Sequence, residues 1–191
     1  MSTFTTEPLE IVLYPDPFLG KVARAIKPEE LKSGKAGGWD LADLIERMKV
    51  TMYAAEGIGL AAPQVGVGLR IFTVDISKDK SGFMALINPV LSNLDGSLIE
   101  EEGCLSIPGI RAKVKRFSGL HVSALDLKGE KIEFDATELL ARVCQHEHDH
   151  LNGILFINKL GMASRAMLRR ALGELEEDYE LAQAKLKKKK G

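Results

Sequence analysis

The residues best suited to catalysis lie in one short run, His-Glu-His-Asp-His at positions 146–150. At ~100° per residue, His146 and His150 point ~40° apart on one face of a helix, one turn from each other. Two imidazoles so placed can bind one metal ion, with Glu147 beside the open coordination position. His148 points ~200° away from His146 and is not an expected ligand. Because three of the chain's four histidines lie in this run, it predicts a metal site rather than a helix end that is merely polar.

The third ligand decides the class of enzyme, and the sequence offers several candidates. In the peptidase pattern H-E-x-x-H-x-x-G-x-x-H, Gly153 is in place but Phe156 stands where the third histidine belongs, which excludes that class. Glu174 lies at the downstream distance used by other zinc peptidases, but its acidic neighbours are typical of a solvated helix face. Cys104, at the end of an expected strand, would complete a Cys–His–His site with a fourth position free for water. Taken alone, Cys104 fits a buried core position equally well.

A third segment with chemical potential is the glycine-rich stretch Gly-Ile-Gly-Leu-Ala-Ala-Pro-Gln at residues 57–64. It follows a helix and lacks the Lys-Ser/Thr ending of phosphate-binding loops, so a phosphate site is disfavoured. Its small residues allow close approach of a substrate backbone, and the Gln64 amide can donate to a developing oxyanion. We expect a loop that borders the site.

Residues 57–64, Glu-Gly-Cys-Leu-Ser at 102–106 and Gln-His-Glu-His-Asp-His-Leu at 145–151 together resemble the three signature motifs of the peptide deformylases, in the same order and spacing. The stretch at residues 9–17 is also similar to the family's N-terminal strand. The resemblance runs from about residue 8 to about residue 160. It implies an α+β fold, with antiparallel β-sheets around a central helix that carries H-E-x-x-H, plus a C-terminal helix.

The resemblance also implies an activity, a cofactor and a substrate. The enzyme would be a metal-dependent hydrolase that removes the N-formyl group from the formyl-methionine of nascent polypeptides and releases formate. One divalent metal ion per chain is implied, with Fe²⁺ as the usual native metal and Zn²⁺ or Ni²⁺ able to occupy the site. The residues do not select the metal, because thiolate and imidazole suit both iron and zinc.

Roles at the reacting centre follow from the same resemblance. The implied metal ligands are Cys104, His146 and His150. Glu147 would take a proton from water and pass it to the departing amine. Gln64 and the backbone N–H of Leu105 would stabilise the oxyanion of the tetrahedral intermediate.

Substrate contacts are expected on either side of that centre. Backbone groups of Ile58 and Gly59 would pair with the substrate as an added strand, a mode that tolerates many sequences. Leu139 and Val143 lie within two turns before the first metal-binding histidine, on its face of the helix, and are expected to form the apolar methionine pocket. Arg111 follows the cysteine motif and would either orient the substrate or form a structural ion pair.

Two other residues of this helix have different expected roles. Arg142 lies near the pocket face, and we expect its stem to cover the rim while its charge reaches solvent. Cys144 lies ~200° from His146 and is expected to be a buried core thiol.

The elements that must position these residues follow from periodicity. Helices are expected at residues 39–53, with Asp40 as N-cap, and at 137–151 and 164–190. Strands are expected at 70–76, 83–90, 98–104, 112–117, 120–125 and 131–134. Because strands follow strands without intervening helices, they favour antiparallel sheets and an α+β fold. Residues 8–38, rich in Pro and Gly, predict an irregular arm with short extended pieces.

Composition limits what kind of protein this is. A chain of 191 residues with 45% hydrophobic and 28% charged residues is typical of a globular protein with one domain. We expect a single catalytic domain at residues 1–161, with an amphipathic helix at 162–191 appended to it. No apolar run approaches the ~18 residues of a membrane span. The start of the chain lacks a signal pattern, so a cytoplasmic location is expected.

Charge is unevenly spread along the chain. Residues 162–191 carry eight basic and five acidic residues, which leaves 18 basic and 22 acidic residues elsewhere. This balance argues against direct sequence-specific nucleic-acid binding. The Lys-rich end keeps open a weak affinity for the ribosome through the C-terminal helix. A non-catalytic ribosome- or RNA-associated factor is the alternative from another functional class.

Overall fold

Antiparallel pairing builds three sheets in the part of the chain that is described. The computed structural model describes residues 7–190, with side chains as far as Leu186. The main sheet has five strands in the order β3 (Gly59–Ala61), β4 (Ile71–Val74), β5 (Met84–Asp95), β8 (Gly119–Leu125) and β9 (Lys131–Thr137). The two-stranded sheets pair β6 (Leu98–Cys104) with β7 (Ile107–Arg116), and β1 (Lys35–Ala36) with β2 (Trp39–Asp40). The expected α+β class is confirmed.

Differences from the expected strands have simple physical causes. β5 continues to Asp95 because its extra residues pair with β8, and β7 begins at Ile107 because its extra residues pair with β6. The stretch expected as a loop at residues 57–64 is instead β3 followed by the 3₁₀ turn η2 (Ala62–Val65). Its small residues allow it to pair with β4, which no pattern of apolar alternation signals.

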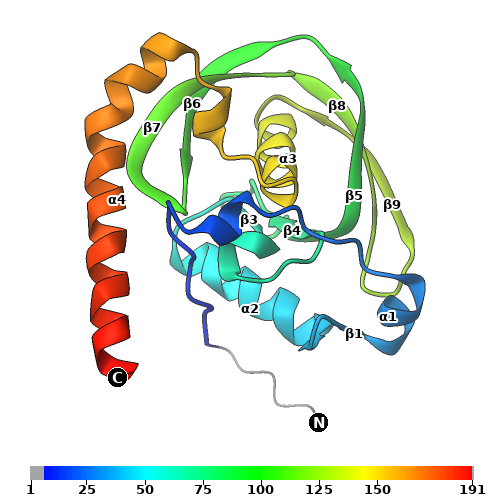
Figure 1. The fold of residues 1–191 in the computed structure, drawn as a ribbon. Coiled ribbons are helices and arrows are strands. Elements are labelled where there is room, and N and C mark those ends of the chain that lie inside the picture. Colours follow the sequence, from blue (N-terminus) through cyan, green and yellow to red (C-terminus); the bar gives the residue numbers. More distant parts are fainter. Residues whose placement is uncertain (1–6, 191) are drawn as a thin grey trace.

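Helix α3 (Glu138–Leu151) stands in the middle of the fold, with β5, β8 and β9 to one side and β6 and β7 to the other (Figure 1). Its apolar residues, Ala141, Cys144 and Leu151 among them, pack in one cluster with Phe72, Val74 and Leu86 of the main sheet. His146, Glu147, Asp149 and His150 are buried as well, and the β6–β7 sheet lies on the other side of the helix. Polar residues enclosed in this way require partners.

Helix α2 (Leu41–Ala54) supports β3 and β4 from another side. Its predicted N-cap is confirmed, since the Asp40 carboxylate accepts hydrogen bonds from two backbone N–H groups of the first turn. Leu44 and Met48 bury their side chains with Leu60 and Ile71 in a second core cluster. This packing holds β3 in place under the site.

The N-terminal arm is more regular than predicted. It contains the 3₁₀ turn η1 (Pro17–Gly20) and the short helix α1 (Pro28–Ser33). Helix α1 begins with a proline at its first position and with the Glu30 carboxylate, which accepts a hydrogen bond from the Lys27 backbone N–H. It ends at Gly34, whose φ of 70° is the left-handed conformation typical of a helix C-terminus. The prediction of an irregular segment was wrong here, because these capping residues outweigh the high share of proline and glycine.

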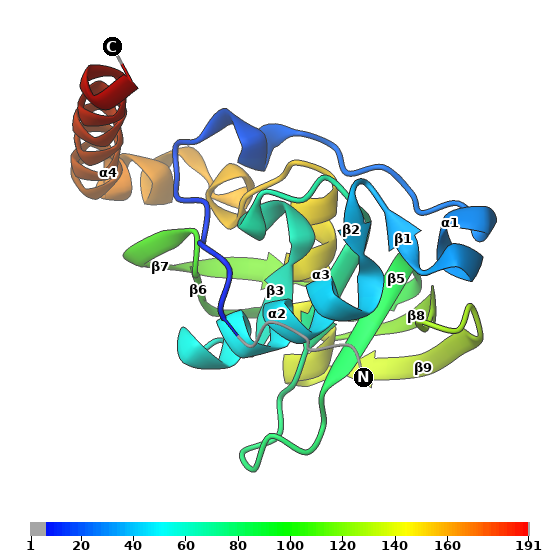
Figure 2. The same ribbon diagram turned by 90° about the horizontal axis from the view of Figure 1, so that it is seen from below.

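Helix α4 (Met162–Lys190) follows the 3₁₀ turn η3 (Phe156–Lys159) and lies on the outside of the molecule, with its C-terminal end away from the sheets (Figures 1 and 2). Its first half packs Leu168 and Leu172 into a third core cluster with residues of β7. Tyr14 and Tyr179 donate side-chain hydrogen bonds that tie the arm to this helix. Within the described residues, none of the helices is long and apolar enough to cross a membrane.

Candidate metal centre

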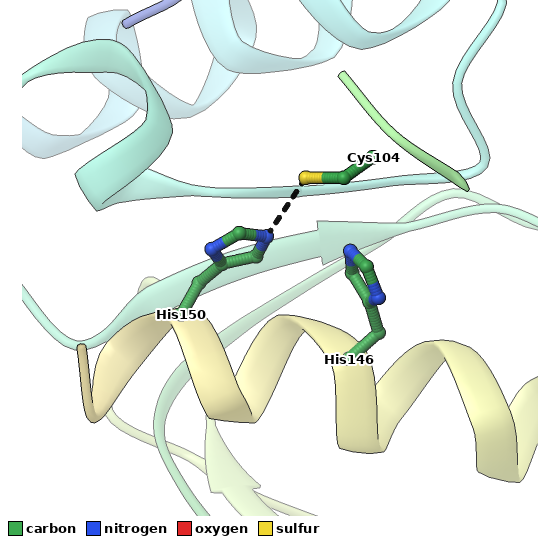
Figure 3. Close-up of side chains that lie close together, drawn as sticks. All are labelled: Cys104, His146 and His150. Atoms are coloured by element: carbon green, nitrogen blue, oxygen red, sulfur yellow. Dashed lines mark hydrogen bonds between the residues drawn. The ribbon is translucent and has the colours of Figure 1, made fainter. Parts of the chain in front are cut away.

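Three side chains with strong metal-binding atoms meet in the interior. The ligand atoms of Cys104, His146 and His150 all lie within 4.8 Å of one another. The Cys104 Sγ is 3.3 Å from the His150 Nε2, and both imidazoles face it from α3 (Figure 3). A thiolate with two imidazoles is a donor set that suits a divalent transition metal and leaves a further coordination position open. The residues present therefore fit a catalytic metal ion.

Two elements that lie far apart in the sequence supply these ligands. The histidines come from α3, whose helical period places them on one face as expected. Cys104 ends β6, where the pairing with β7 becomes irregular between Gly103 and Cys104 before the chain turns. That turn directs the thiol toward the helix.

Glu102 is a residue for which sequence reasoning assigned no role, and it supports the site. Its Oε2 accepts a hydrogen bond from the His146 Nδ1 at 3.1 Å, which leaves the Nε2 of that ring for a metal. Arg116 binds the same carboxylate through two nitrogens, each at 2.9 Å. Burial by itself would raise the pKa of Glu102, but these hydrogen bonds and positive charges lower it to about 2. A glutamate two residues before the cysteine, on the same face of a strand, was the available signal.

The same network continues behind the helix. Arg116 also binds Asp149 of α3, whose carboxylate accepts from the Lys159 ammonium at 3.1 Å. Phe156 stacks on the His146 ring, with 6.3 Å between centroids. Carboxylates, cations and an aromatic ring thus fix the orientation of the metal-facing imidazole.

The two imidazoles differ in pKa when no metal ion is considered. Burial lowers the pKa of His150, so this ring is neutral and able to bind a cation. Burial alone would also lower the pKa of His146, but hydrogen bonds with Cys104 and Glu102 raise it to about 10. Metal binding at this ring must therefore release a proton.

Glu147 points into the site from the helix without being part of the ligand set. Its side chain is 3% exposed, and its Oε2 has no hydrogen-bond partner among the described residues. Burial raises its pKa to about 7, although the positive charges of His146 and Arg116 lower it. A carboxyl group with a pKa near neutrality can both accept and give up a proton. The structure thus places the expected base next to the metal ligands.

The expected oxyanion donors lie on the other side of the thiol. Gln64 is buried, and its Oε1 accepts from the backbone N–H of Ala61 at 2.8 Å. This contact orients the amide so that Nε2 donates toward the Ser106 Oγ at 3.3 Å and the Cys104 Sγ at 3.5 Å. Leu105 follows the cysteine directly in the turn after β6. Both expected donors are therefore beside the Cys104 thiol.

A single cavity of about 640 Å³ joins these groups. All the residues expected to act at the centre or to bind substrate line it except His150, which is not part of the lining: Ile58, Gly59, Gln64, Cys104, Leu105, Arg111, Leu139, Val143, His146 and Glu147. Val143 is buried in the wall, whereas Leu139 is exposed at the mouth. The structure thus brings the expected residues together in one place.

Four other expectations have definite outcomes. Arg111 pairs with the exposed Glu101 at 3.1 Å, as the ion-pair alternative expects, and it also lines the cavity, so a role toward substrate stays a prediction. Cys144 is fully buried, and burial raises its pKa to about 12, which confirms a core thiol. Glu174 pairs with Arg170 on the exposed face of α4, so the structure does not bring it to the histidines.

Arg142 is the expectation that fails. It does not reach solvent, since its side chain is buried and its Nη1 donates to the Glu102 Oε1 at 2.7 Å. An interior carboxylate is a better partner than water for a guanidinium that would otherwise have to stretch past the rim. Sequence reasoning missed this pairing because Glu102 lies 40 residues away in the chain.

Comparisons with known proteins agree with this site. The family model described as polypeptide deformylase matches residues 8–166. A peptide deformylase of Hydrogenovibrio crunogenus is 50% identical over 157 residues, which span 82% of this chain and 88% of the relative. A peptide deformylase structure from Legionella pneumophila aligns with a TM-score of 0.76 at 38% identity, over 93% of this chain and 98% of that one. The structure of a plant peptide deformylase aligns with a TM-score of 0.84 at 33% identity, over 96% of this chain and 97% of that one.

Proposed function

The chain belongs to the peptide deformylase family, and we propose that Cys104, His146 and His150 hold the metal ion on which its deformylase activity depends. The observation that carries the proposal is the meeting of three donor atoms within 4.8 Å of one another, two of them, from Cys104 and His146, on residues that line the same cavity as Glu147. Formylated peptides are the substrates that the family implies. We expect these to be nascent chains that begin with formyl-methionine.

A bound divalent cation would act as a Lewis acid, making the attacking water more acidic and polarising the formyl carbonyl. We propose Fe²⁺ as the native ion, with Zn²⁺ or Ni²⁺ able to replace it, because thiolate and imidazole donors suit all three. Elemental analysis of protein purified without oxygen tests this assignment. A preparation that is active but contains only zinc would contradict it.

The residues of the chain would divide the remaining work. Glu147 would accept the proton of the attacking water and deliver it to the amine as the C–N bond breaks, giving formate and a free N-terminus. The Gln64 amide and the Leu105 N–H would donate to the oxygen that gains negative charge. Burial of the amide and of the carboxylate supports these roles, because a hydrogen bond or charge acts more strongly away from water.

Substrate would lie along β3. This strand is at the end of its sheet, so its outer edge has backbone groups that do not pair with β4. Ile58 and Gly59 line the cavity at that edge and would pair with the peptide backbone. Leu139 and Val143 would contact the methionine side chain, and Arg111 would meet the peptide at the cavity edge.

The activity can be tested directly by formate release from formyl-Met-Ala-Ser. Protein prepared without oxygen with Fe²⁺, or loaded with Ni²⁺, should release formate, and removal of the metal by a chelator should abolish it. Metal-loaded, folded protein without formate release would contradict the proposed function.

Gly59 leads to a specific prediction, because its neighbour is the proposed base. A Cβ at this position would lie 2.4 Å from the Glu147 Oε1 and 2.8 Å from the Val143 Cγ1. Gly59→Ala should therefore displace the carboxylate and lower kcat/KM by about 100-fold, the scale of a misplacement of about 1 Å. Gly20→Ala is the matched control, since no atom lies within 4 Å of the added Cβ. Equal kcat/KM for both variants would count against this position for Glu147.

We also propose that residues 162–191 form a helix appended to a catalytic domain at residues 1–161, and that its basic end gives the enzyme weak affinity for ribosomes. Support comes from the position of α4 on the outside of the fold. The side chains of residues 187–190, on which the charge depends, lie outside the described part of the structure. A substrate made of nascent chains also supports a cytoplasmic location.

The ribosome proposal predicts a salt-dependent interaction. Deletion of residues 185–191 should reduce co-sedimentation with ribosomes at low salt, while formate release from a short peptide stays the same. The full chain should lose its affinity as salt rises, because binding is driven by the release of counterions and this release yields less free energy at higher salt concentration. An unchanged co-sedimentation profile after the deletion would contradict the proposal.

A further inference from the structure

Arg142 is a charged residue in a place that substrate binding does not explain. It lines the cavity beside Leu139 and Val143, which are expected to hold an apolar side chain, yet its own side chain is only 6% exposed. A buried guanidinium without a partner is strongly unfavourable. Among the described residues only its Nη1 has hydrogen-bond partners, while Nε and Nη2 are buried without one, so the acceptors of Nη1 explain the position of Arg142.

Arg142 binds the carboxylate of Glu102, and this carboxylate accepts four hydrogen bonds in all. Its Oε1 accepts from the Arg142 Nη1 at 2.7 Å and from the Arg116 Nε at 2.9 Å. Its Oε2 accepts from the Arg116 Nη2 at 2.9 Å and from the His146 Nδ1 at 3.1 Å. A carboxylate offers about four acceptor positions, and all of them are occupied here.

Two of these four bonds, those from Arg142 and His146, connect β6 with α3, the two elements that supply the metal ligands. Glu102 and Cys104 are two residues apart on β6, and both side chains reach α3, at His146 and His150 respectively. Arg142 and His146 are four residues apart on α3, so they share a face of the helix. Glu102 is thus hydrogen-bonded to α3 at two positions, one turn apart. These two hydrogen bonds fix the separation between the thiol on the strand and the imidazoles on the helix.

Two weaker contacts strengthen the connection. The Arg142 Nη1 also lies 3.3 Å from the Val114 carbonyl oxygen and 3.4 Å from that of Glu100, on the paired strands β7 and β6. One guanidinium on α3 therefore reaches both strands of the sheet that carries Cys104.

We propose that Arg142 is a positioning residue, which holds Glu102 against His146 and so sets the spacing between the thiolate and the imidazoles around the metal ion. The inference rests on the metal site proposed above and adds a residue outside the ligand set to it. Removal of the guanidinium should loosen the site without removing a ligand. Partners of this kind contribute about 10- to 100-fold to metal affinity or activity.

The experiment compares Arg142→Leu, Arg142→Lys and Arg70→Leu, each loaded with Co²⁺. Leucine keeps an apolar wall in the cavity, and lysine restores one positive donor. Arg70 is the matched control, because it also hydrogen-bonds α3 at His148, and Asn152 directly after the helix, outside the lining of the cavity. The readouts are the visible absorption of the Co²⁺–thiolate centre, the rate of Co²⁺ loss to a chelator, and kcat and KM for formyl-Met-Ala-Ser. Circular dichroism establishes that each variant is folded.

We expect Arg142→Leu to lose Co²⁺ at least about tenfold faster than wild type, with an altered spectrum and a lower kcat at similar KM. Arg142→Lys should recover part of the loss, and Arg70→Leu should match wild type. A spectrum and release rate unchanged in Arg142→Leu would overturn the role of Arg142. Failure of the wild-type chain to bind Co²⁺ would instead overturn the metal site itself, so the two proposals fail in distinguishable ways.

Discussion

Replacement of Glu147 with glutamine should lower kcat for formyl-Met-Ala-Ser by about 10²- to 10⁴-fold, the usual contribution of a general acid–base group. Glutamine has the same shape but cannot accept a proton. The carboxyl group is buried, one of its oxygens has no partner among the described residues, and its pKa is raised to about 7 by burial. These properties suit a group that takes a proton and returns it within one reaction. Because Glu147 is outside the ligand set, the variant should still hold one metal ion per chain.

A control on the same helix makes this result specific. Glu138 is exposed in the first turn of α3, and Glu138→Gln should leave kcat unchanged. Metal content and kcat measured together distinguish the outcomes. If Glu147→Gln loses its metal, the residue serves the coordination sphere and not proton transfer. If it retains both metal and full activity, another group is the base.

Replacement of Cys104 with serine should remove the metal ion and, with it, nearly all activity. Thiolate is the only sulfur donor of the set, and a neutral hydroxyl is a far weaker ligand at neutral pH. Loss of a residue that only hydrogen-bonds to a metal ligand lowers metal affinity by about 10- to 100-fold. Loss of a direct ligand such as Cys104 should lower metal affinity by at least as much. Elemental analysis of the purified variant and a chelator competition with Zn²⁺ measure the loss.

The other cysteine of the chain is the matched control. Cys144 lies on the same helix as the histidines but faces the core, where burial raises its pKa to about 12. Cys144→Ser should lower the stability of the fold, because it places a hydroxyl in an apolar cluster, but it should keep the metal. If Cys104→Ser binds metal as wild type does, the Cys–His–His site is wrong. In that case Glu174→Gln should be examined, because the alternative site would use Glu174 as the third metal ligand.

Local periodicity was enough to predict the arrangement of the helical residues. His146, Glu147 and His150 lie where a period of 3.6 residues places them, and Cys144 lies in the core for the same reason. Strand succession was likewise enough for antiparallel sheets, because neighbouring strands in the chain tend to pair with each other. Such features depend on residues a few positions apart, whose relative direction is set by the backbone.

Only the tertiary structure decided which distant residues meet. Cys104 by itself fitted a core position as well as a ligand, and its distance from the imidazoles depends on how the β6–β7 sheet folds over α3. Arg142 was expected at the rim, because the sequence did not show that a carboxylate 40 residues away would lie beneath it. The sequence by itself determined the donor types and the face of the helix that bears them. Tertiary packing decided which of these residues pair with one another. Burial makes an unpaired charge unfavourable, but it does not select the partner.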